Sequence, residues 1–342
     1  MAQNNIPEWW RFRGEGDPRH HVEIPQAPPW RVFGSALADE GEWRPQVRAD
    51  HQYWKRARTY RVEPTVIDAV NAALWLRRPL LLTGSPGTGK TTLIYRVAFE
   101  LGLGPVLEWA VNSRSRLKDA LYEYDALGRL QDQQREPDKA HDIGQYITLR
   151  ALGTALLPAR RPRALLIDEI DKADPDLPND LLNLFEEGSF EIPELLREKA
   201  NRARVRPMMP LALQQRGDPA EGDASTTVEI SAGTIRCQEF PFVVLTSNGE
   251  REFPPAFLRR CIRAKLPDPG VDQLKRIVSA HLGTDVTERV VKQIEAFANA
   301  GPRNTAMDQF LNSLYLVHKA PGMNDDTRTK LETLLMQPIL RS

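Results

Sequence analysis

The chain has 342 residues, a length that allows one substantial hydrophobic core and a smaller satellite domain. Its 46 lysines and arginines balance its 46 aspartates and glutamates, so net charge does not mark nucleic acid or a membrane surface as the partner. Two cysteines without metal-ligand spacing, no apolar run of membrane-spanning length and no signal-peptide pattern at the start predict a cytoplasmic protein.

Residues 1–55 form an N-terminal arm that is rich in tryptophan and proline and has neither helical nor strand periodicity. A disordered tail is poor in aromatic residues, so we expect this arm to dock on something. Its host could be its own core, a neighbouring subunit or a partner protein, and we favour a structural staple on its own core. The tryptophans concerned are Trp9, Trp10, Trp30, Trp43 and Trp54.

From residue 56 to 270 the chain alternates between helical patterns and short apolar runs typical of buried strands. Helices are expected from Pro64 to near Arg77 and over Thr91–Leu101. This alternation predicts an α/β fold in which helices sandwich a parallel sheet. The expected strands are Leu80–Thr83, Val106–Val111, Ala164–Ile167, Phe242–Thr246 and Arg263–Leu266.

Two inserts, near 117–146 and 190–235, interrupt this alternation. In the second, alternating residues at Phe190–Ile192 and Thr227–Ile230 predict a β-hairpin with a long tip. Residues 271–342 show only helical patterns, roughly four, and predict a small all-α lid domain.

The run Gly84-Ser85-Pro86-Gly87-Thr88-Gly89-Lys90-Thr91 fits the phosphate-loop pattern G-x-x-x-x-G-K-[ST] at every fixed position. An apolar strand precedes the loop, and an amphipathic helix over Thr91–Leu101 follows it. Thr92, in the first turn of that helix, is the last of the predicted nucleotide-binding residues. The glycines allow backbone amides to turn toward phosphate oxygens, and the helix N-terminus adds its dipole. Lys90 would place a cation on the β- and γ-phosphates, and the Thr91 hydroxyl would bind Mg²⁺.

A second chemical signal is the pair Asp168-Glu169 at the end of an apolar strand. Carboxylates at a buried strand end are costly unless an ion or a polar network receives them. We expect Asp168 to hold the Mg²⁺ shell and Glu169 to polarise the attacking water.

Polar and basic residues further along the chain supply the remaining candidates. Asn248 ends the Phe242–Thr246 strand, whose tip is expected beside the carboxylate strand, where the amide would orient the water or the γ-phosphate. Arg259 and Arg260 end a short helix, where either could stabilise phosphoryl transfer in a neighbouring subunit or simply be solvated. Arg303 opens a helix of the lid and could reach the nucleotide from there.

The order of these features resembles the AAA+ superfamily and, within it, the MoxR family of ATPases. The resemblance covers about residues 60–320 and is carried by PLLLTGSPGTGKTTL, LLIDEIDKADPDLPNDLLNLFEEGSFEIP and FVVLTSNGEREFPPAFLRRCIRAKLP. By resemblance, Lys90 and Thr91 are Walker A residues and Asp168 and Glu169 form Walker B. Asn248 is then sensor 1, Arg303 sensor 2, and the arginine finger falls at Arg259 or Arg260.

The resemblance also implies ATP with Mg²⁺, a ring that is a homo-hexamer, and a chaperone-like action on protein partners that often contain a von Willebrand factor A domain. GTP remains an alternative to ATP, because the sequence does not show which residues recognise the nucleotide base. The PEWWRFRG arm is similar to that of MoxR-like ATPases in bacterial conflict systems. The arm and the loop near 202–226 depart from the usual pattern of the family.

Two other classes of function stay open at the level of sequence. Basic runs at 114–116 and 197–206 would suit a nucleic-acid motor or loader, although such runs are usually solvated surface. A nucleotide-dependent switch would bind ATP without cycling, which the presence of Glu169, Asn248 and the arginines argues against. Tyr122 and Tyr124 could line a central pore, but we favour a local core for both.

Overall fold

The computed structural model describes residues 6–14, 22–34, 42–60, 62–136, 142–199, 201–210, 227–282, 288–300, 307–319 and 324–336. The chain divides into two compact units, one of Met1–Leu82 with Thr91–Ala264 and one of Thr83–Lys90 with Lys265–Ser342. The division into arm, nucleotide-binding domain and lid stays a prediction. No helix in the described ranges combines the length and the apolar content needed to cross a membrane.

A five-stranded sheet in the order β11-β1-β10-β5-β2 forms the centre of the first unit. Strand β5 pairs in parallel with both of its neighbours, so that Leu165 lies opposite Val243 on one side and Leu107 on the other. All six residues of β10 are buried, as expected for a strand covered on both faces. The parallel sheet predicted from the sequence is confirmed, with strands β1 Leu80–Thr83, β2 Leu107–Ala110, β5 Ala164–Asp168, β10 Phe242–Ser247 and β11 Ile262–Lys265.

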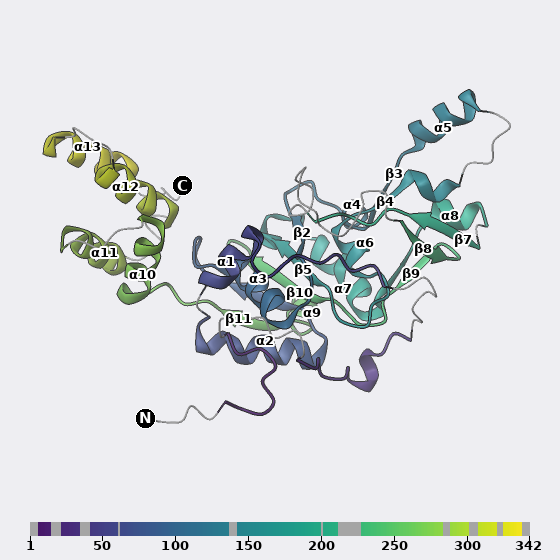
Figure 1. Cartoon of the computed structure of the whole chain (residues 1–342), viewed down its shortest axis with the longest axis horizontal. Helices are drawn as coiled ribbons and strands as arrows, with labels where there is room; N and C mark the ends of the chain where they lie inside the picture. The colour runs from purple at the N-terminus through teal and green to yellow at the C-terminus, as the bar shows by residue number, and fades with distance from the viewer. Residues whose placement is uncertain are drawn as a thin grey trace. The chain divides into compact units, whose positions relative to one another are not determined.

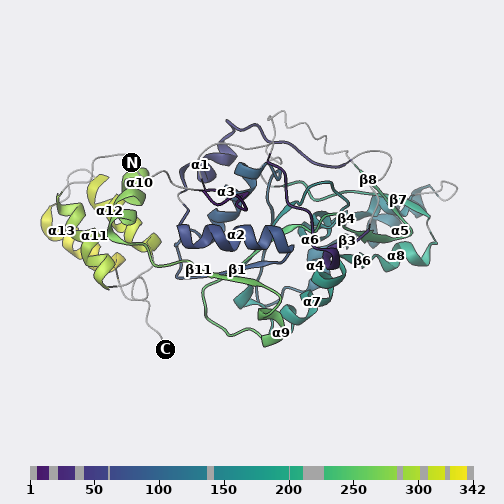
Figure 2. The same cartoon turned by 90° about the horizontal axis from the view of Figure 1, so that it is seen from below.

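Helix α2, Pro64–Leu76, shows how the sequence sets the flanking helices. Pro64 occupies the first turn, where its fixed φ suits a helix and no amide is lost. Arg77 ends the helix in the left-handed conformation, with φ 50°. Both views show α2 along β11, and Figure 2 shows it along β1 as well (Figure 1; Figure 2). The other helices of this part are α1 Lys55–Thr59, α3 Lys90–Leu101, α6 Ala151–Ala155, α7 Leu177–Glu187 and α9 Pro255–Leu258.

The first insert contains α4, Leu117–Leu121, and an antiparallel pair of strands, β3 Tyr122–Tyr124 and β4 Ile147–Leu149. Helix α5, Ala126–Arg135, lies between these strands in the chain and projects away from the central sheet in Figure 1. The Tyr122 ring is buried and its hydroxyl donates to Glu194 Oε2 at 2.7 Å. Tyr124 is partly buried against the same core, so both tyrosines have the local packing role that we favoured.

The second insert corrects the hairpin predicted from the sequence. Phe190 lies in β6, Ser189–Glu191, which pairs with β9, Thr234–Arg236, rather than with 227–230. The 227–230 segment belongs to β8, Val228–Ser231, which pairs antiparallel with β7, Arg202–Val205. The physical reason is Pro193, which starts helix α8, Pro193–Arg197, and turns the chain away after only three strand residues.

The second unit contains four helices in the described residues, in agreement with the predicted all-helical C-terminal region. Their apolar stripes meet in a separate core, in which the Phe297 and Phe310 rings stack with centroids 4.2 Å apart. This core is built from residues three or four positions apart on each helix, such as Leu274 and Val278. The helices are α10 Val271–Leu282, α11 Glu288–Ala300, α12 Met307–Lys319 and α13 Asp325–Leu335.

The described part of the N-terminal arm docks on the first unit, as the staple interpretation predicts. Phe12 is fully buried, and the Asn71 side chain on α2 replaces a strand partner for the arm backbone. Asn71 Oδ1 accepts from the Arg11 and Phe12 amides at 2.7 and 3.0 Å, and Nδ2 donates to the Phe12 carbonyl at 2.8 Å. The Arg13 amide donates to Glu100 Oε1 on α3 at 2.7 Å.

A buried arginine fixes the arm a second time. Arg31 belongs to a short 3₁₀ turn, η1, Pro29–Arg31, and donates to the carbonyls of Arg77 and Phe185, at 2.8 Å in both cases. Its guanidinium lies 4.7 Å from the Phe240 ring centroid, a cation–π contact. Burial lowers the pKa of Arg31, and the nearby Glu186 carboxylate partly offsets that effect.

Replacing Asn71 by Ala should loosen the arm, because it leaves the buried Arg11 and Phe12 backbone groups without their partner. We expect the free energy of unfolding to fall by about 1–3 kcal/mol in urea titrations. Asn179→Ala, which alters an exposed asparagine on α7, is the matched control. An unchanged urea midpoint for Asn71→Ala would contradict the staple.

The two thiols give a pH-dependent prediction. Both cysteines are buried and free, and burial raises the pKa of Cys237 and of Cys261 to about 12. The folded protein should therefore resist alkylation at pH 8, whereas both thiols should react once guanidinium unfolds the chain. Because the unfolded thiols ionise near 9.0, the stability that they contribute is present below that pH and is lost as the pH rises toward 12. Mass spectrometry after iodoacetamide treatment tests this, and rapid alkylation of the native protein would contradict it.

Candidate functional site

The glycine-rich loop follows β1 and runs directly into helix α3, which begins at Lys90. Gly87 and Gly89 have φ of 79° and 87°, in the left-handed region that favours glycine. The buried Lys90 ammonium donates to the carbonyls of Gly84 and Ser85 at 2.9 and 3.0 Å. The loop thus curves around its own lysine at the positive end of a helix, which is a suitable arrangement for an anion.

Close packing also restricts the start of the loop to glycine. A Cβ on Gly84 would lie 3.0 Å from the Leu266 carbonyl oxygen and 3.2 Å from Thr88 Oγ1. The Thr88 hydroxyl is itself fixed, because it donates to the Ser85 carbonyl at 2.9 Å. The remaining predicted positions differ in exposure: Pro86 and Gly87 are exposed, and Thr92 is half-buried on α3.

The Asp168 carboxylate collects hydroxyl groups from two other elements. Its Oδ1 accepts from Thr91 Oγ1 on α3 at 3.1 Å and from Thr246 Oγ1 on β10 at 2.5 Å. The structure therefore brings together Thr91 and Asp168, the two residues predicted to bind a metal ion. Hydroxyl and carboxylate oxygens are the ligands that Mg²⁺ prefers, so the residues present fit this ion.

Glu169 lies in a strained turn immediately after β5. Its φ is 60°, a conformation that non-glycine residues seldom adopt and that recurs at functional sites. The amide of Glu169 donates to Thr246 Oγ1 at 2.9 Å, and its carboxylate pairs with Lys172 Nζ at 2.7 Å. Hydrogen bonding to this carboxylate raises the pKa of Lys172. The predicted base is thus held by a lysine three residues away.

Asn248 follows β10, the strand that lies next to β5 in parallel register. The backbone amide of Asn248 donates to Asp171 Oδ2 at 2.8 Å. Because β5 and β10 run parallel, the segments after Asp168 and after Ser247 lie at the same edge of the sheet, as the sequence predicts.

The paired arginines differ in their surroundings. Arg260 Nε donates to Glu186 Oε1 at 2.7 Å, and its Nη1 donates to the Ala256 carbonyl at 3.2 Å. Arg259 is exposed, and no residue in the described ranges pairs with its guanidinium. The structure therefore distinguishes two residues that the sequence left equivalent. Arg303 lies outside the described residues.

Three residues near the predicted site escaped sequence reasoning: Thr246, Asp171 and Lys172. A hydroxyl within an otherwise apolar strand was the available signal for Thr246, because a buried hydroxyl needs a partner. Asp171 is only 3 % exposed, which its position after an Asp-Glu pair does not indicate. The role of Lys172 depends on the turn at Glu169, which the sequence does not specify.

Comparison with known proteins adds a family. The model described as AAA domain (dynein-related subfamily) matches residues 79–261, whereas no curated protein matches the chain. Among solved structures, the chain is similar to NtrX from Brucella abortus in complex with ADP, at 14% identity and a TM-score of 0.33 over 84% of this chain and 50% of that one. It is also similar to Hsp104 with ATPγS and FITC casein in a closed state, at 17% identity and a TM-score of 0.34 over 79% and 43%. The chain thus spans half or less of the length of these two proteins.

The family match extends over more than half of the chain. It includes the glycine-rich loop, the Asp168-Glu169 pair, the end of β10 and both arginines after α9. The chain therefore belongs to the AAA domain family, dynein-related subfamily.

Proposed function

We propose that the protein is a ring-forming AAA+ machine of the MoxR type that uses ATP hydrolysis to remodel a protein partner. The observation that supports this most directly is the cluster in which Asp168 accepts from Thr91 and Thr246, with Glu169 and Asn248 beside it. A protein that only bound nucleotide would need the loop but not a base and a polar group at two neighbouring strand ends.

In this proposal, residues 84–91 bind the triphosphate through backbone amides, and Lys90 exchanges a loop carbonyl for phosphate oxygens. Thr91 and Asp168 would hold Mg²⁺, which when bound neutralises charge on the phosphates. Thr246 then keeps the Asp168 carboxylate oriented through the bond between them. None of the described residues to which we assign a role would contact the adenine or guanine ring of the nucleotide. The proposed preference for ATP over GTP therefore rests on the family.

Glu169 is the proposed general base for the attacking water. To act, its carboxylate must leave Lys172, to which it is bound at 2.7 Å, and both side chains are 44% exposed, so this exchange is open to solvent. Asn248 would orient the water or the γ-phosphate, and Arg303 would contact the nucleotide from the lid. Together these groups position and polarise, which is the main contribution of a protein to phosphoryl transfer.

We assign the arginine finger to Arg259, because its guanidinium is exposed while Arg260 is engaged by Glu186 of the same chain. The side chain of an arginine finger extends across the subunit interface to the phosphates bound by the neighbouring subunit, so this assignment requires a homo-oligomeric ring. By family we propose a hexamer in the cytoplasm. Its partner would be a protein that carries a von Willebrand factor A domain.

Two variants test the roles of the loop and the base. Lys90→Ala should abolish turnover and weaken nucleotide binding without unfolding the chain. Glu169→Gln should bind nucleotide as the wild type does but stall, with kcat lower by about 10²-fold or more. Steady-state hydrolysis and fluorescent-nucleotide titration separate the two effects, and wild-type kcat for Glu169→Gln would reassign the base.

The same Glu169→Gln protein, loaded with ATP, serves as a trap for the partner. Affinity capture should recover an assembled ring together with a protein bearing the expected domain, and the capture should be lost with Lys90→Ala. Stimulation of the wild-type ATPase by DNA, with a steep dependence on salt, would instead favour a nucleic-acid motor.

The assignment of the finger predicts complementation between subunits. Arg259→Ala should lower kcat by about 10³-fold, whereas Arg260→Ala, the matched control, should lose less than about tenfold. Mixing Arg259→Ala with Lys90→Ala, each inactive alone, should restore up to about a quarter of wild-type activity, because neighbours then complete each other's sites. No recovery after subunit exchange, verified by mass spectrometry of mixed rings, would exclude a finger acting in trans at Arg259.

A further inference from the structure

We propose that Asp171 is a positioning residue, which acts by fixing the loop that carries Asn248 relative to the segment that carries Glu169. This inference rests on the proposed function, since it assigns a supporting role around Asn248. It concerns a residue that touches neither the phosphate loop nor the Asp168 cluster in any described contact.

Burial makes Asp171 unusual among the acids of this region. Its side chain is 3% exposed, and an isolated buried carboxylate is expensive unless hydrogen bonds receive it. The donors come from a single loop: Ser247 Oγ at 3.0 Å, the Asn248 amide at 2.8 Å and the Glu250 amide at 3.3 Å. All three reach the same oxygen, Oδ2.

The loop is thereby anchored on both sides of Asn248. The one remaining amide, that of Gly249, donates to Ser247 Oγ at 3.0 Å, so it is tied to Asp171 through that hydroxyl. Gly249 has φ 77°, which lets the backbone turn so that amides on either side of it point inward. Asp171 therefore holds the backbone on both sides of Asn248.

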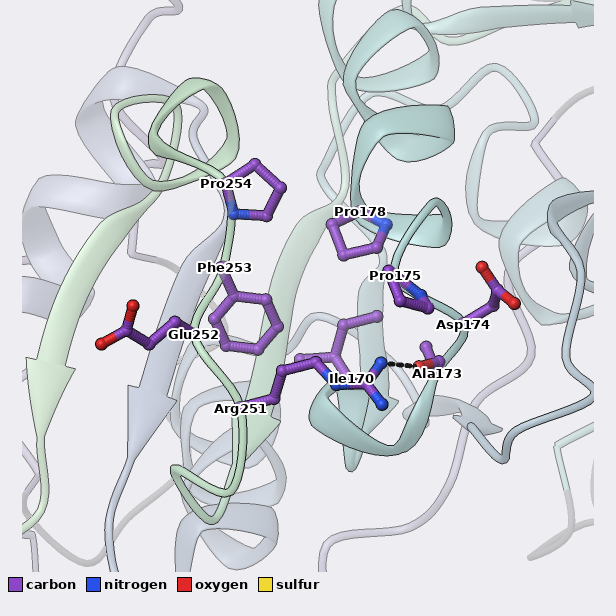
Figure 3. Close-up of a pocket in the computed structure, with 9 residues that line it drawn as sticks. All are labelled: Ile170, Ala173, Asp174, Pro175, Pro178, Arg251, Glu252, Phe253 and Pro254. Atoms are coloured by element: carbon purple, nitrogen blue, oxygen red, sulfur yellow. Dashed lines mark hydrogen bonds between the residues drawn. The ribbon is translucent and has the colours of Figure 1, made fainter.

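The carboxylate belongs to the segment that follows the proposed base. Asp171 lies in the 3₁₀ turn η4, Ile170–Lys172, directly after Glu169, and its neighbour Lys172 holds the Glu169 carboxylate. A second tie joins the same two segments, since Arg251 Nη1 donates to the Ala173 carbonyl at 2.6 Å (Figure 3). The ends of β5 and β10 are thus linked by polar contacts as well as by the sheet.

Beyond the Arg251 bond the two segments separate. A pocket of about 260 Å³ opens between them, with Pro175 and Pro178 on one wall and Phe253 and Pro254 on the other (Figure 3). The hydrogen bonds to Asp171 therefore act together with the sheet pairing, the Thr246–Glu169 bond and the Arg251 bond to align Asn248 with Glu169. A displacement of about 1 Å is enough to lower a rate about 10²-fold.

The second oxygen of Asp171 suggests a conservative variant. Oδ1 is buried and has no hydrogen-bond partner among the described residues. In Asp171→Asn, the amide oxygen can take the place of Oδ2 and accept all three bonds, while the NH₂ group replaces Oδ1. Because the three donors keep an acceptor in the same place, this variant should retain at least about a third of the wild-type kcat.

The decisive measurement is a double-mutant cycle with Asn248 in the full-length ATPase. Asp171→Ala should lower kcat by about 10²-fold with nucleotide affinity and KM within about threefold of wild type. If Asp171 acts through Asn248, the same substitution in an Asn248→Ala background should lower kcat by less than about twofold further. Asp180→Ala, an exposed acid on α7, is the control and should match the wild type.

If Asp171→Ala does not fold, as judged by circular dichroism and thermal unfolding, Ser247→Ala replaces it in the cycle. This variant removes one donor and the tie to Gly249, and it should lower kcat by about three- to tenfold, again without a further loss when Asn248 is already Ala. Wild-type kcat for the folded variant, or full additivity with Asn248→Ala, would overturn the role of Asp171. Wild-type kcat for Asn248→Ala alone would instead show that the proposed role of Asn248 has failed, and the inference with it.

Discussion

The carboxylate of Asp168 joins three elements that lie far apart in the sequence. Thr91 comes from the first turn of α3, Asp168 ends β5 and Thr246 lies near the end of β10, yet their oxygens meet within hydrogen-bond distance. The parallel register of β5 and β10 makes this possible, because it brings the carboxyl ends of both strands to one edge. The helix that begins with the phosphate-loop lysine is thus tied to the strand that supplies the acids.

Thr246 makes this contact more than an attachment. Its single hydroxyl donates to Asp168 and accepts from the Glu169 amide, so one side chain orients a proposed metal ligand and the backbone of the proposed base. Glu169 can hold its left-handed conformation, which costs on the order of 1–3 kcal/mol, because the surrounding bonds determine it. In the proposed mechanism, the Glu169 carboxylate would exchange its ion pair with Lys172 for the attacking water, and a side-chain rotation would be enough for this exchange.

Much of the fold could be predicted because its signals are local. Apolar runs located the strands of the central sheet, and the spacing of glycines around Lys90 located the phosphate loop. The partners of β6 and β8 could not be predicted, since pairing depends on where Pro193 turns the chain. Site residues that lie within motifs were accessible in the same way. Asp171 and Thr246 were not, because a carboxylate or hydroxyl reveals its role only through contacts made more than 70 positions away.

The manner in which the arm is anchored has a consequence for how the smallest folding unit of this protein should be defined. Asn71 on α2 and the buried Glu100 on α3 both accept hydrogen bonds from backbone amides of residues 11–13, so removing the arm would take these donors away. Deleting the arm would expose the apolar surface that buries Phe12 and would remove these backbone donors from Asn71 and Glu100. A protein without the N-terminal arm would lose solubility for a reason unrelated to nucleotide binding. The smallest folding unit therefore includes the arm.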